Sequence, residues 1–178
     1  MHTLICGVTE SGKTTLARAL ANKLAETGAG IVVYDPVNSG TAGGGWPSSA
    51  IIFDDESEFF DYLSRDDVKN AHIFIDEAGD IFNLGKRENF WLLTRGRHFG
   101  FNIFMIVQRP KMIAPSARTQ ASVAYLFRLS PDDLREIGQD FGHGGIEKIV
   151  LDKGDFVVLH SGCTSINRAN VFNLLKEQ

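Results

Sequence analysis

Residues 7–15, GVTESGKTT, combine glycines, a lysine and hydroxyl groups in a spacing that suits phosphate binding. The segment 7–14 satisfies the pattern G-x-x-x-x-G-K-[ST] in full and stands between an apolar run and a helical pattern, the context that this pattern requires. The glycines let backbone N–H groups turn toward a β-phosphate, and the following helix directs its dipole at the same charge. The residues predicted to bind phosphate are Gly7, Thr9, Glu10, Ser11, Gly12, Lys13, Thr14 and Thr15.

Two side chains in this loop and an acid elsewhere have specific expected roles. Lys13 is expected to bridge the β- and γ-phosphates, and Thr14 is expected to give its hydroxyl to Mg²⁺. Asp76 follows the buried apolar run at 72–75 and is the predicted second Mg²⁺ partner, reached through water or through Thr14. The spacing therefore predicts a metal-assisted phosphate site.

Two further polar residues follow apolar runs. Glu77, directly after Asp76, is placed to polarise a water molecule for in-line attack on the γ-phosphate, which favours hydrolysis over phosphoryl transfer to a small acceptor. The alternative is that Glu77 only caps the next helix. Gln108 follows the apolar run at 102–107, and there it is expected to touch the γ-phosphate or the attacking water. The alternative for Gln108 is an ordinary loop residue.

Hydrophobic patterning predicts the elements that position these residues. Strands and helices alternate, which is typical of an α/β fold with a mainly parallel sheet flanked by helices. The whole chain, 1–178, is predicted to form a single domain, and the Gly- and Ser-rich segment 38–49 a mobile surface loop. Strands are expected at 3–6, 31–34, 50–53, 72–76, 102–107 and 122–129, helices at 14–26, 56–64, 87–96 and 131–141, and a terminal β-hairpin from 155–160 and 165–172.

Composition restricts the environment and the partners. The two cysteines are too few for a disulfide framework, and no run of about 18 apolar residues occurs, so a soluble intracellular protein without a transmembrane segment is expected. The net charge is −4, yet seven of the 18 basic residues and a single acid lie between Lys86 and Arg118. This segregation predicts a basic surface facing a polyanion or a neighbouring subunit. The alternative is a solvated loop face.

Four motifs together resemble one family. The segments GVTESGKTT, VVYDP, IFIDEAGDIF and RGRHFGFNIFMIVQRP are similar to the FtsK/HerA class of P-loop ATPases. Within that class they most resemble the short DNA-packaging ATPases of membrane-containing or tailless icosahedral viruses. The likeness covers roughly residues 1 to 130. It implies a RecA-like P-loop NTPase sheet with an additional strand carrying the catalytic Glu77, and it implies ATP and Mg²⁺ as cofactors.

The resemblance also implies partners. Members form homo-oligomeric rings, usually hexamers, with ATP at each interface and double-stranded DNA through the centre. A neighbouring subunit then supplies an arginine to the γ-phosphate. By the family pattern Arg118 is the first candidate, with Arg128, Arg97 and Arg95 as alternatives. A capsid vertex or virion membrane proteins are further implied partners, and the host cytoplasm or the virion is the implied location.

The predicted function is ATP-driven translocation of double-stranded DNA, with packaging of a viral genome into a preformed capsid. Two alternatives stay open. The first is an assembly or secretion ATPase acting on protein cargo, similar to zonula-occludens-toxin-like ATPases. The second is a small-molecule P-loop kinase, although no arginine-bearing lid is evident. The C-terminal part shows no motif beyond its closing hairpin.

Overall fold

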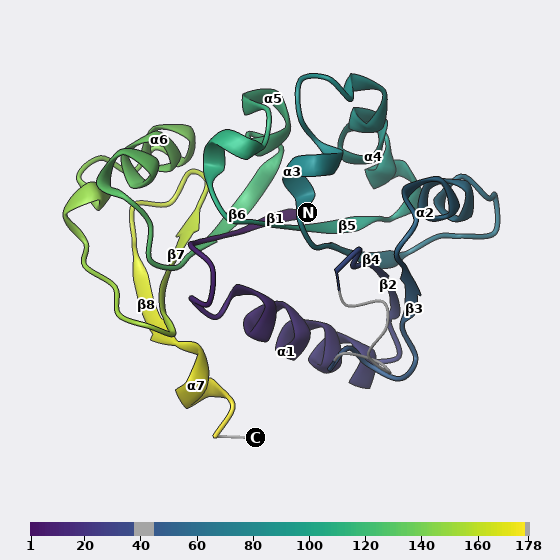
Figure 1. Ribbon diagram of the computed structural model, residues 1–178, viewed down its shortest axis with the longest axis horizontal. Helices are drawn as coiled ribbons and strands as arrows, with labels where there is room; N and C mark the ends of the chain where they lie inside the picture. Colours follow the sequence, from purple (N-terminus) through teal and green to yellow (C-terminus); the bar gives the residue numbers. More distant parts are fainter. Residues whose placement is uncertain (38–44, 177–178) are drawn as a thin grey trace.

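The computed structural model describes residues 1–37 and 45–176, and it contains an eight-stranded sheet of order β3-β2-β4-β5-β1-β6-β7-β8 (Figure 1). The first six strands of this order pair in parallel, whereas β7 pairs antiparallel with both β6 and β8. Residues 38–44 of the predicted loop lie outside the described residues. The strands are β1 (His2–Cys6), β2 (Gly30–Tyr34), β3 (Ile51–Phe53), β4 (Ala71–Ile75), β5 (Asn102–Val107), β6 (Ala121–Leu126), β7 (Asp155–His160) and β8 (Asn167–Asn170).

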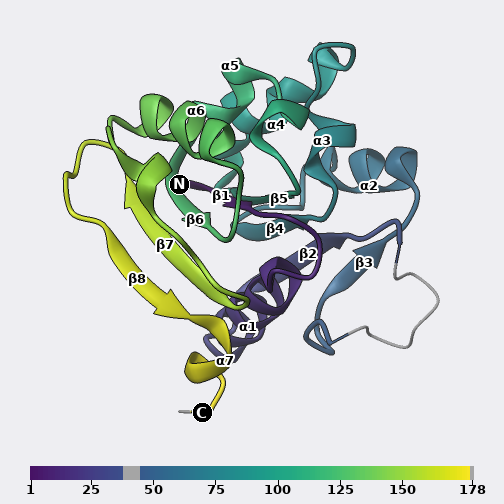
Figure 2. The ribbon, with the colours of Figure 1, turned by 60° about the vertical axis from the view of Figure 1, so that its left-hand side comes forward.

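Helices cover both faces of the sheet (Figures 1 and 2). One face packs against α1 and the short α7, and the other face packs against the helices from α2 to α6. A separate group of buried apolar side chains fills each interface. The helices are α1 (Lys13–Glu26), α2 (Glu56–Leu63), α3 (Ala78–Ile81), α4 (Trp91–Thr94), α5 (Pro115–Arg118), α6 (Pro131–Phe141) and α7 (Val171–Leu174).

Strand β1 occupies a central position. It pairs with β5 on one side and with β6 on the other, and all five of its residues are buried. Burial on both faces explains why this strand and its neighbours read as continuous apolar runs. The predicted α/β fold with a mainly parallel sheet, and the predicted terminal hairpin of β7 and β8, are both confirmed.

Two predicted elements differ in the structure. The helix expected at 87–96 is divided into a 3₁₀ turn (Arg87–Phe90), α4 and a second 3₁₀ turn (Gly96–Phe99). At Gly96 the chain tightens and passes close to Phe101, where an added Cβ would lie 3.3 Å from the ring. The strand expected over 165–172 ends at Asn170, because the Asn170 side chain caps α7. Among the described residues no helix has the length and apolarity needed to cross a membrane.

Candidate functional site

The candidate site lies at the carboxyl ends of three adjacent strands. Strands β4, β5 and β1 are neighbours in the sheet and end at Ile75, Val107 and Cys6. Asp76 and Glu77 therefore follow one strand, Gln108 follows the next, and the phosphate loop follows the third. In parallel α/β sheets this edge is where ligands bind. The topology brings together residues that are far apart in the sequence.

The phosphate loop, residues 7–12, requires glycine at its two ends. A Cβ at Gly7 would lie 2.5 Å from the Cβ of Phe127, a contact that only glycine avoids. Gly12 has φ 112°, a backbone conformation that favours glycine, and α1 begins directly after it. The buried hydroxyl of Ser11 has no hydrogen-bond partner in the described structure. An unpartnered buried donor at this loop fits a phosphate oxygen as its missing partner.

Lys13 and Thr14 begin helix α1 beside the loop. The ammonium of Lys13 donates to the carbonyl oxygen of Val8 (3.0 Å), so the side chain folds back over the loop. Burial lowers the pKa of Lys13 below its ordinary value, while the nearby carboxylates oppose that change. An incoming phosphate would supply the negative charge that a desolvated ammonium favours.

Thr14 and Asp76 form an oxygen pair suited to a metal ion. The Thr14 hydroxyl lies 3.5 Å from Oδ2 of Asp76. Burial, followed by the charge of Asp35, raises the pKa of Asp76 to about 6. A carboxylate held among negative charges favours a nearby cation, and Mg²⁺ prefers such oxygen ligands together with phosphate oxygens. The pair therefore fits Mg²⁺ brought in with a nucleotide.

Glu77 is held in an unusual position. Its backbone is left-handed, with φ 53° and ψ 45°, which is uncommon for a residue with a side chain. Gln108 Nε2 donates to Glu77 Oε1 (2.9 Å), and the Thr9 hydroxyl lies 3.4 Å from Gln108 Oε1. Glu77 precedes α3 but its side chain makes no capping hydrogen bond there. This geometry favours a role in chemistry over helix capping.

The polar side chains of Thr9, Gln108 and Glu77 thus connect the phosphate loop to the strand-end acid. Each lies on a different segment, after β1, β5 and β4 respectively. A ligand that contacts Thr9 or Gln108 would also affect the orientation of the Glu77 carboxylate. The sequence predicted each residue separately, and the structure adds their hydrogen-bonded order.

Arg118 was the first candidate for the arginine supplied to a neighbouring subunit's γ-phosphate, but the structure buries it inside its own subunit. Only 3% of its side chain is exposed, and it pairs with Glu136 (2.9 Å) and Asp140 (2.5 Å) of α6. Its guanidinium also donates to the carbonyl oxygen of Pro110 (2.9 Å). A buried guanidinium with three partners inside its own subunit cannot extend to another subunit. Arg118 instead holds α5 and the segment after Gln108 against α6.

The three alternative arginines are all exposed, but they lie at different edges of the sheet. Arg128 follows β6 at the carboxyl edge, and its carbonyl oxygen accepts a hydrogen bond from Val8 N (3.0 Å). It is therefore next to its own phosphate loop. Arg95 and Arg97 precede β5 and lie at the amino edge, opposite Gln108. They therefore lie at the opposite edge of the sheet from this chain's own phosphate loop.

One part of the site carries no motif in the sequence. A pocket of about 240 Å³ beside the phosphate loop is lined by Lys153 and Phe172 in addition to loop and α1 residues. These two residues belong to the C-terminal part of the chain, for which only a hairpin was predicted. Their position depends on how β7 and β8 extend the sheet past β6, and no residue spacing indicates that arrangement.

Comparisons with known proteins show which folds this chain resembles. The model of the zonular occludens toxin (Zot) family matches residues 46–131. The chain superposes on B204, the DNA-packaging ATPase of Sulfolobus turreted icosahedral virus, with a TM-score of 0.77, 18% identity and coverage of 95% of this chain and 96% of that one. B204 of Sulfolobus turreted icosahedral virus 2 in complex with ATP-gammaS gives a TM-score of 0.72 at 19% identity, covering 95% and 96%.

A third similar structure is the conjugation coupling protein TcpA of pCW3 with ATPgS, at a TM-score of 0.72 and 18% identity, covering 98% of this chain and 61% of that one. No curated protein matches the sequence. The chain therefore has the P-loop NTPase fold of these ATPases, and the resemblance to the FtsK/HerA-like class is confirmed at the level of the fold.

Proposed function

We propose that this P-loop ATPase fold belongs to a motor that hydrolyses ATP to move double-stranded DNA, and that it packages a viral genome into a capsid. One observation supports the proposed hydrolysis. The Glu77 carboxylate lies 2.9 Å from the Gln108 amide, beside a complete phosphate loop and Asp76. A carboxylate at that position is suited to take a proton from water. The likeness to viral packaging ATPases supports the assignment to DNA.

The residues divide the reaction among them. Lys13 and the loop N–H groups would bind the β- and γ-phosphates, and Thr14 and Asp76 would hold Mg²⁺, which would neutralise charge on the phosphates. Glu77 accepts the proton of the attacking water, and Gln108 orients the Glu77 carboxylate. The Thr9 hydroxyl connects this pair to the loop that holds the phosphates. Loss of the γ-phosphate would thereby be communicated to Gln108.

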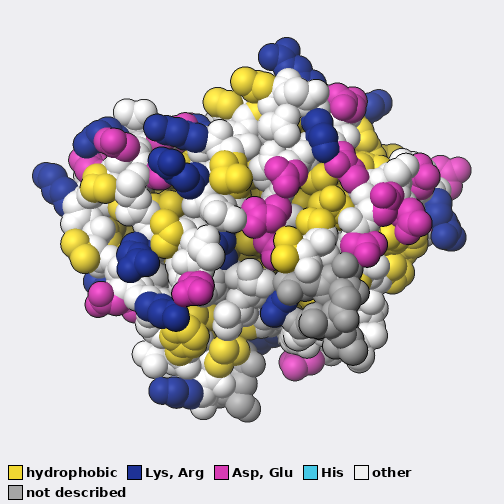
Figure 3. All heavy atoms as spheres, viewed as in Figure 1, with side chains coloured by type: hydrophobic (Ala, Val, Ile, Leu, Met, Phe, Trp, Pro, Cys, Tyr) yellow, Lys and Arg dark blue, Asp and Glu magenta, His cyan; other side chains and the backbone are white. Residues whose placement is uncertain are grey.

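A head-to-tail ring is the proposed assembly. On the face in Figure 3, acidic side chains gather over α2, whereas lysine and arginine side chains, with acidic ones among them, lie over α6 and β7. Two unlike surfaces on one chain favour a heterologous contact, which closes into a ring when the rotation permits. In such a ring Arg95 or Arg97 acts on the neighbour's γ-phosphate in place of Arg118. The exposed acids in and beside α2 are Asp54, Asp55, Glu58, Asp61, Asp66 and Asp67.

DNA contact is proposed for part of the basic segment 86–118. Three of its lysine and arginine residues have partners within the subunit. Lys86 pairs with Glu56, Arg109 pairs with Asp133, and the buried Arg118 pairs with Asp140. Four exposed lysine and arginine residues of this segment pair with no described acid, namely Arg87, Arg95, Arg97 and Lys111. Because Arg95 and Arg97 are assigned to the neighbour's site, Arg87 and Lys111 are the proposed DNA contacts. Contacts of this kind bind backbone phosphates and carry no sequence information.

The steady-state ATPase rate with and without long double-stranded DNA tests the proposal. We expect DNA to raise the rate at low salt and to lose this effect at moderate salt, because each phosphate contact releases counterions. The double variant Arg87→Ala, Lys111→Ala is expected to keep the DNA-free rate and to need several-fold more DNA for half-maximal stimulation. Arg65→Ala is the matched control, since the Arg65 guanidinium already pairs with Asp67.

A second candidate function is an ATPase that acts on protein cargo. The observation that favours it is the match of the Zot family model to residues 46–131. Hydrolysis that does not respond to DNA at either salt concentration would contradict the DNA motor and favour this candidate. Absence of hydrolysis under both conditions, with ATP bound, would contradict both.

Replacement of Lys13 by alanine is expected to weaken ATP binding by about 10- to 100-fold, the usual effect of losing a hydrogen bond to a charged group. The buried ammonium contributes its charge directly at the phosphate loop. Titration with a fluorescent ATP analogue measures the change. Lys23→Ala alters an exposed lysine in the last turn of the same helix and should leave the affinity unchanged. Equal affinity in the two variants would remove Lys13 from the binding site.

A further inference from the structure

The C-terminal segment is joined to the phosphate loop by backbone hydrogen bonds. Gly154 N donates to the carbonyl oxygen of Ser11 (3.1 Å), and Val171 N donates to the carbonyl oxygen of Gly154 (2.9 Å). An added Cβ at Gly12 would lie 3.0 Å from Cγ1 of Val171. The ends of β7 and β8 nearest the loop are therefore fixed against it.

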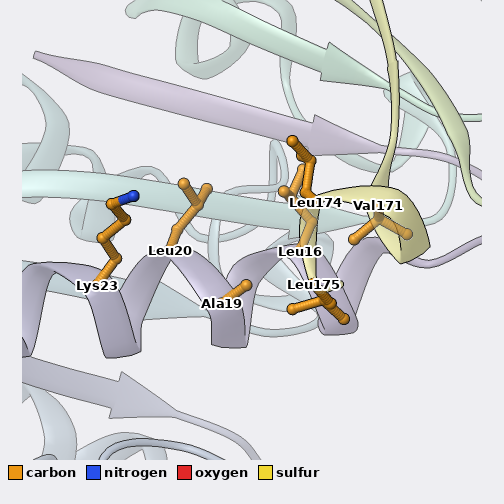
Figure 4. A pocket seen from close by; sticks show the side chains of 7 residues that line it. All are labelled: Leu16, Ala19, Leu20, Lys23, Val171, Leu174 and Leu175. Atoms are coloured by element: carbon orange, nitrogen blue, oxygen red, sulfur yellow. The ribbon is translucent and has the colours of Figure 1, made fainter. Parts of the chain in front are cut away.

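Helix α7 is also fixed to α1, the helix that begins at the phosphate loop. Figure 4 shows Val171 and Leu174 of α7, and Leu175 directly after it, facing Leu16 and Leu20 of α1 across a shared groove. Val171 is fully buried, and Leu16 is 3% exposed. Apolar contact between the two helices holds α7 in one position relative to the loop.

Phe172, the second residue of α7, is placed by several contacts. Its backbone N–H donates to Oδ1 of Asn170 (3.0 Å), while Asn170 Nδ2 donates to Asp155 Oδ1 (2.7 Å). The ring lies against the backbone of Gly154, where an added Cβ would come within 2.5 Å of it. Yet 40% of the side chain stays exposed. A large apolar ring is thus held firmly beside the loop with one part open to solvent.

That open part faces a pocket shared with the phosphate loop. The pocket holds about 240 Å³. Its walls bring together residues of the loop and of α1 with an ammonium and an aromatic ring from the C-terminal segment, namely Glu10, Gly12, Lys13, Thr14, Thr15, Lys153 and Phe172. A nucleoside triphosphate needs both a phosphate site and an apolar surface for its planar base, and these two lie next to each other here.

We propose that this pocket binds the base and ribose of the nucleotide, with the base against the ring of Phe172 and the Lys153 ammonium facing the phosphate-proximal part. The inference rests on the proposed function, because it assigns the rest of the same ligand. The phenyl ring has no hydrogen-bonding group, so it contacts any base without reading its edge. The site therefore accepts purine nucleoside triphosphates with little discrimination between adenine and guanine.

Binding of ATP and of inorganic tripolyphosphate to the full chain, each with Mg²⁺, tests this assignment. Base–aromatic contacts of this kind change affinity by about 5- to 100-fold. We expect Phe172→Ala to weaken binding of ATP and GTP by such a factor and to leave tripolyphosphate binding unchanged. Phe172→Trp should keep the affinity for ATP, and the fluorescence of the introduced indole should change on ATP binding.

Ile166→Ala is the matched control, because Ile166 is an apolar residue of the same C-terminal segment, is 38% exposed and lines neither this pocket nor the α1 groove. It should alter neither affinity. Unchanged ATP affinity in Phe172→Ala, or an equal loss for ATP and tripolyphosphate, would overturn the inference while leaving the phosphate site in place. A wild-type protein that binds neither ligand would overturn the proposed function, and the inference with it.

Discussion

Replacement of Glu77 by glutamine is expected to slow ATP turnover by about 100- to 1,000-fold while nucleotide binding stays intact. The amide cannot accept the proton of the attacking water, so the loss falls on the chemical step. Its carbonyl oxygen can still accept the 2.9 Å hydrogen bond from Gln108, and the substitution keeps the size of the side chain. Single-turnover hydrolysis and ATP titration of the same preparation separate the two effects.

Asp80→Asn is the control for this experiment. Asp80 is an exposed acid three residues beyond Glu77, and its backbone N–H donates to the Glu77 carbonyl oxygen (2.9 Å). Removing the charge of Asp80 changes the electrostatic field near Glu77 but leaves Glu77, the proposed general base, intact. Turnover should therefore stay near the wild-type rate. Normal hydrolysis by Glu77→Gln would show that another group accepts the proton.

Replacement of Arg118 by alanine is expected to lower the free energy of unfolding by about 3 kcal/mol, the lower end of the range for breaking a buried ion pair. Glu136 and Asp140 would lose their shared partner, but their side chains are 28% and 18% exposed, so water replaces part of the interaction. The carbonyl oxygen of Pro110 would lose a donor as well. Chemical denaturation followed by circular dichroism measures the change.

Arg135→Ala gives the matched comparison. Arg135 lies on α6 itself and pairs with Asp132, but both side chains are exposed, at 53% and 77%, so little change in stability is expected. A stable Arg118→Ala protein that loses ATPase activity and recovers it when mixed with Glu77→Gln subunits would contradict the structural role. It would restore Arg118 as the residue that acts on a neighbour.

The sequence predicted those site residues that lie in a continuous motif or directly after an apolar run. The phosphate loop is a continuous motif, and Asp76, Glu77 and Gln108 each follow an apolar run that is buried on both faces. The rule that parallel strands end at one edge was then enough to place these residues together. The left-handed backbone of Glu77 and its bond to Gln108 could not be predicted, because both depend on side-chain packing across strands.

Arg118 shows why the remainder could not be predicted from the sequence. Its partners Glu136 and Asp140 are spaced four residues apart on α6, so both face the same side of that helix, but nothing in the sequence indicates that α5 packs there. A family pattern places an arginine after the Q-R-P segment without specifying its burial. Phe172 is a comparable case, since its position depends on how the antiparallel β7 and β8 extend the sheet.

The central position of β1 also determines when the phosphate site can form during protein synthesis. The backbone N–H of Ile103 in β5 donates a hydrogen bond to Nδ1 of His2 in β1, and these residues are 101 positions apart. A nascent chain must therefore expose β1 and the apolar side of α1 until β5, and then β6, leave the ribosome. Contacts this distant in sequence slow folding. A chaperone that binds exposed apolar segments would protect the chain during that interval, and the ability to bind phosphate would be acquired late.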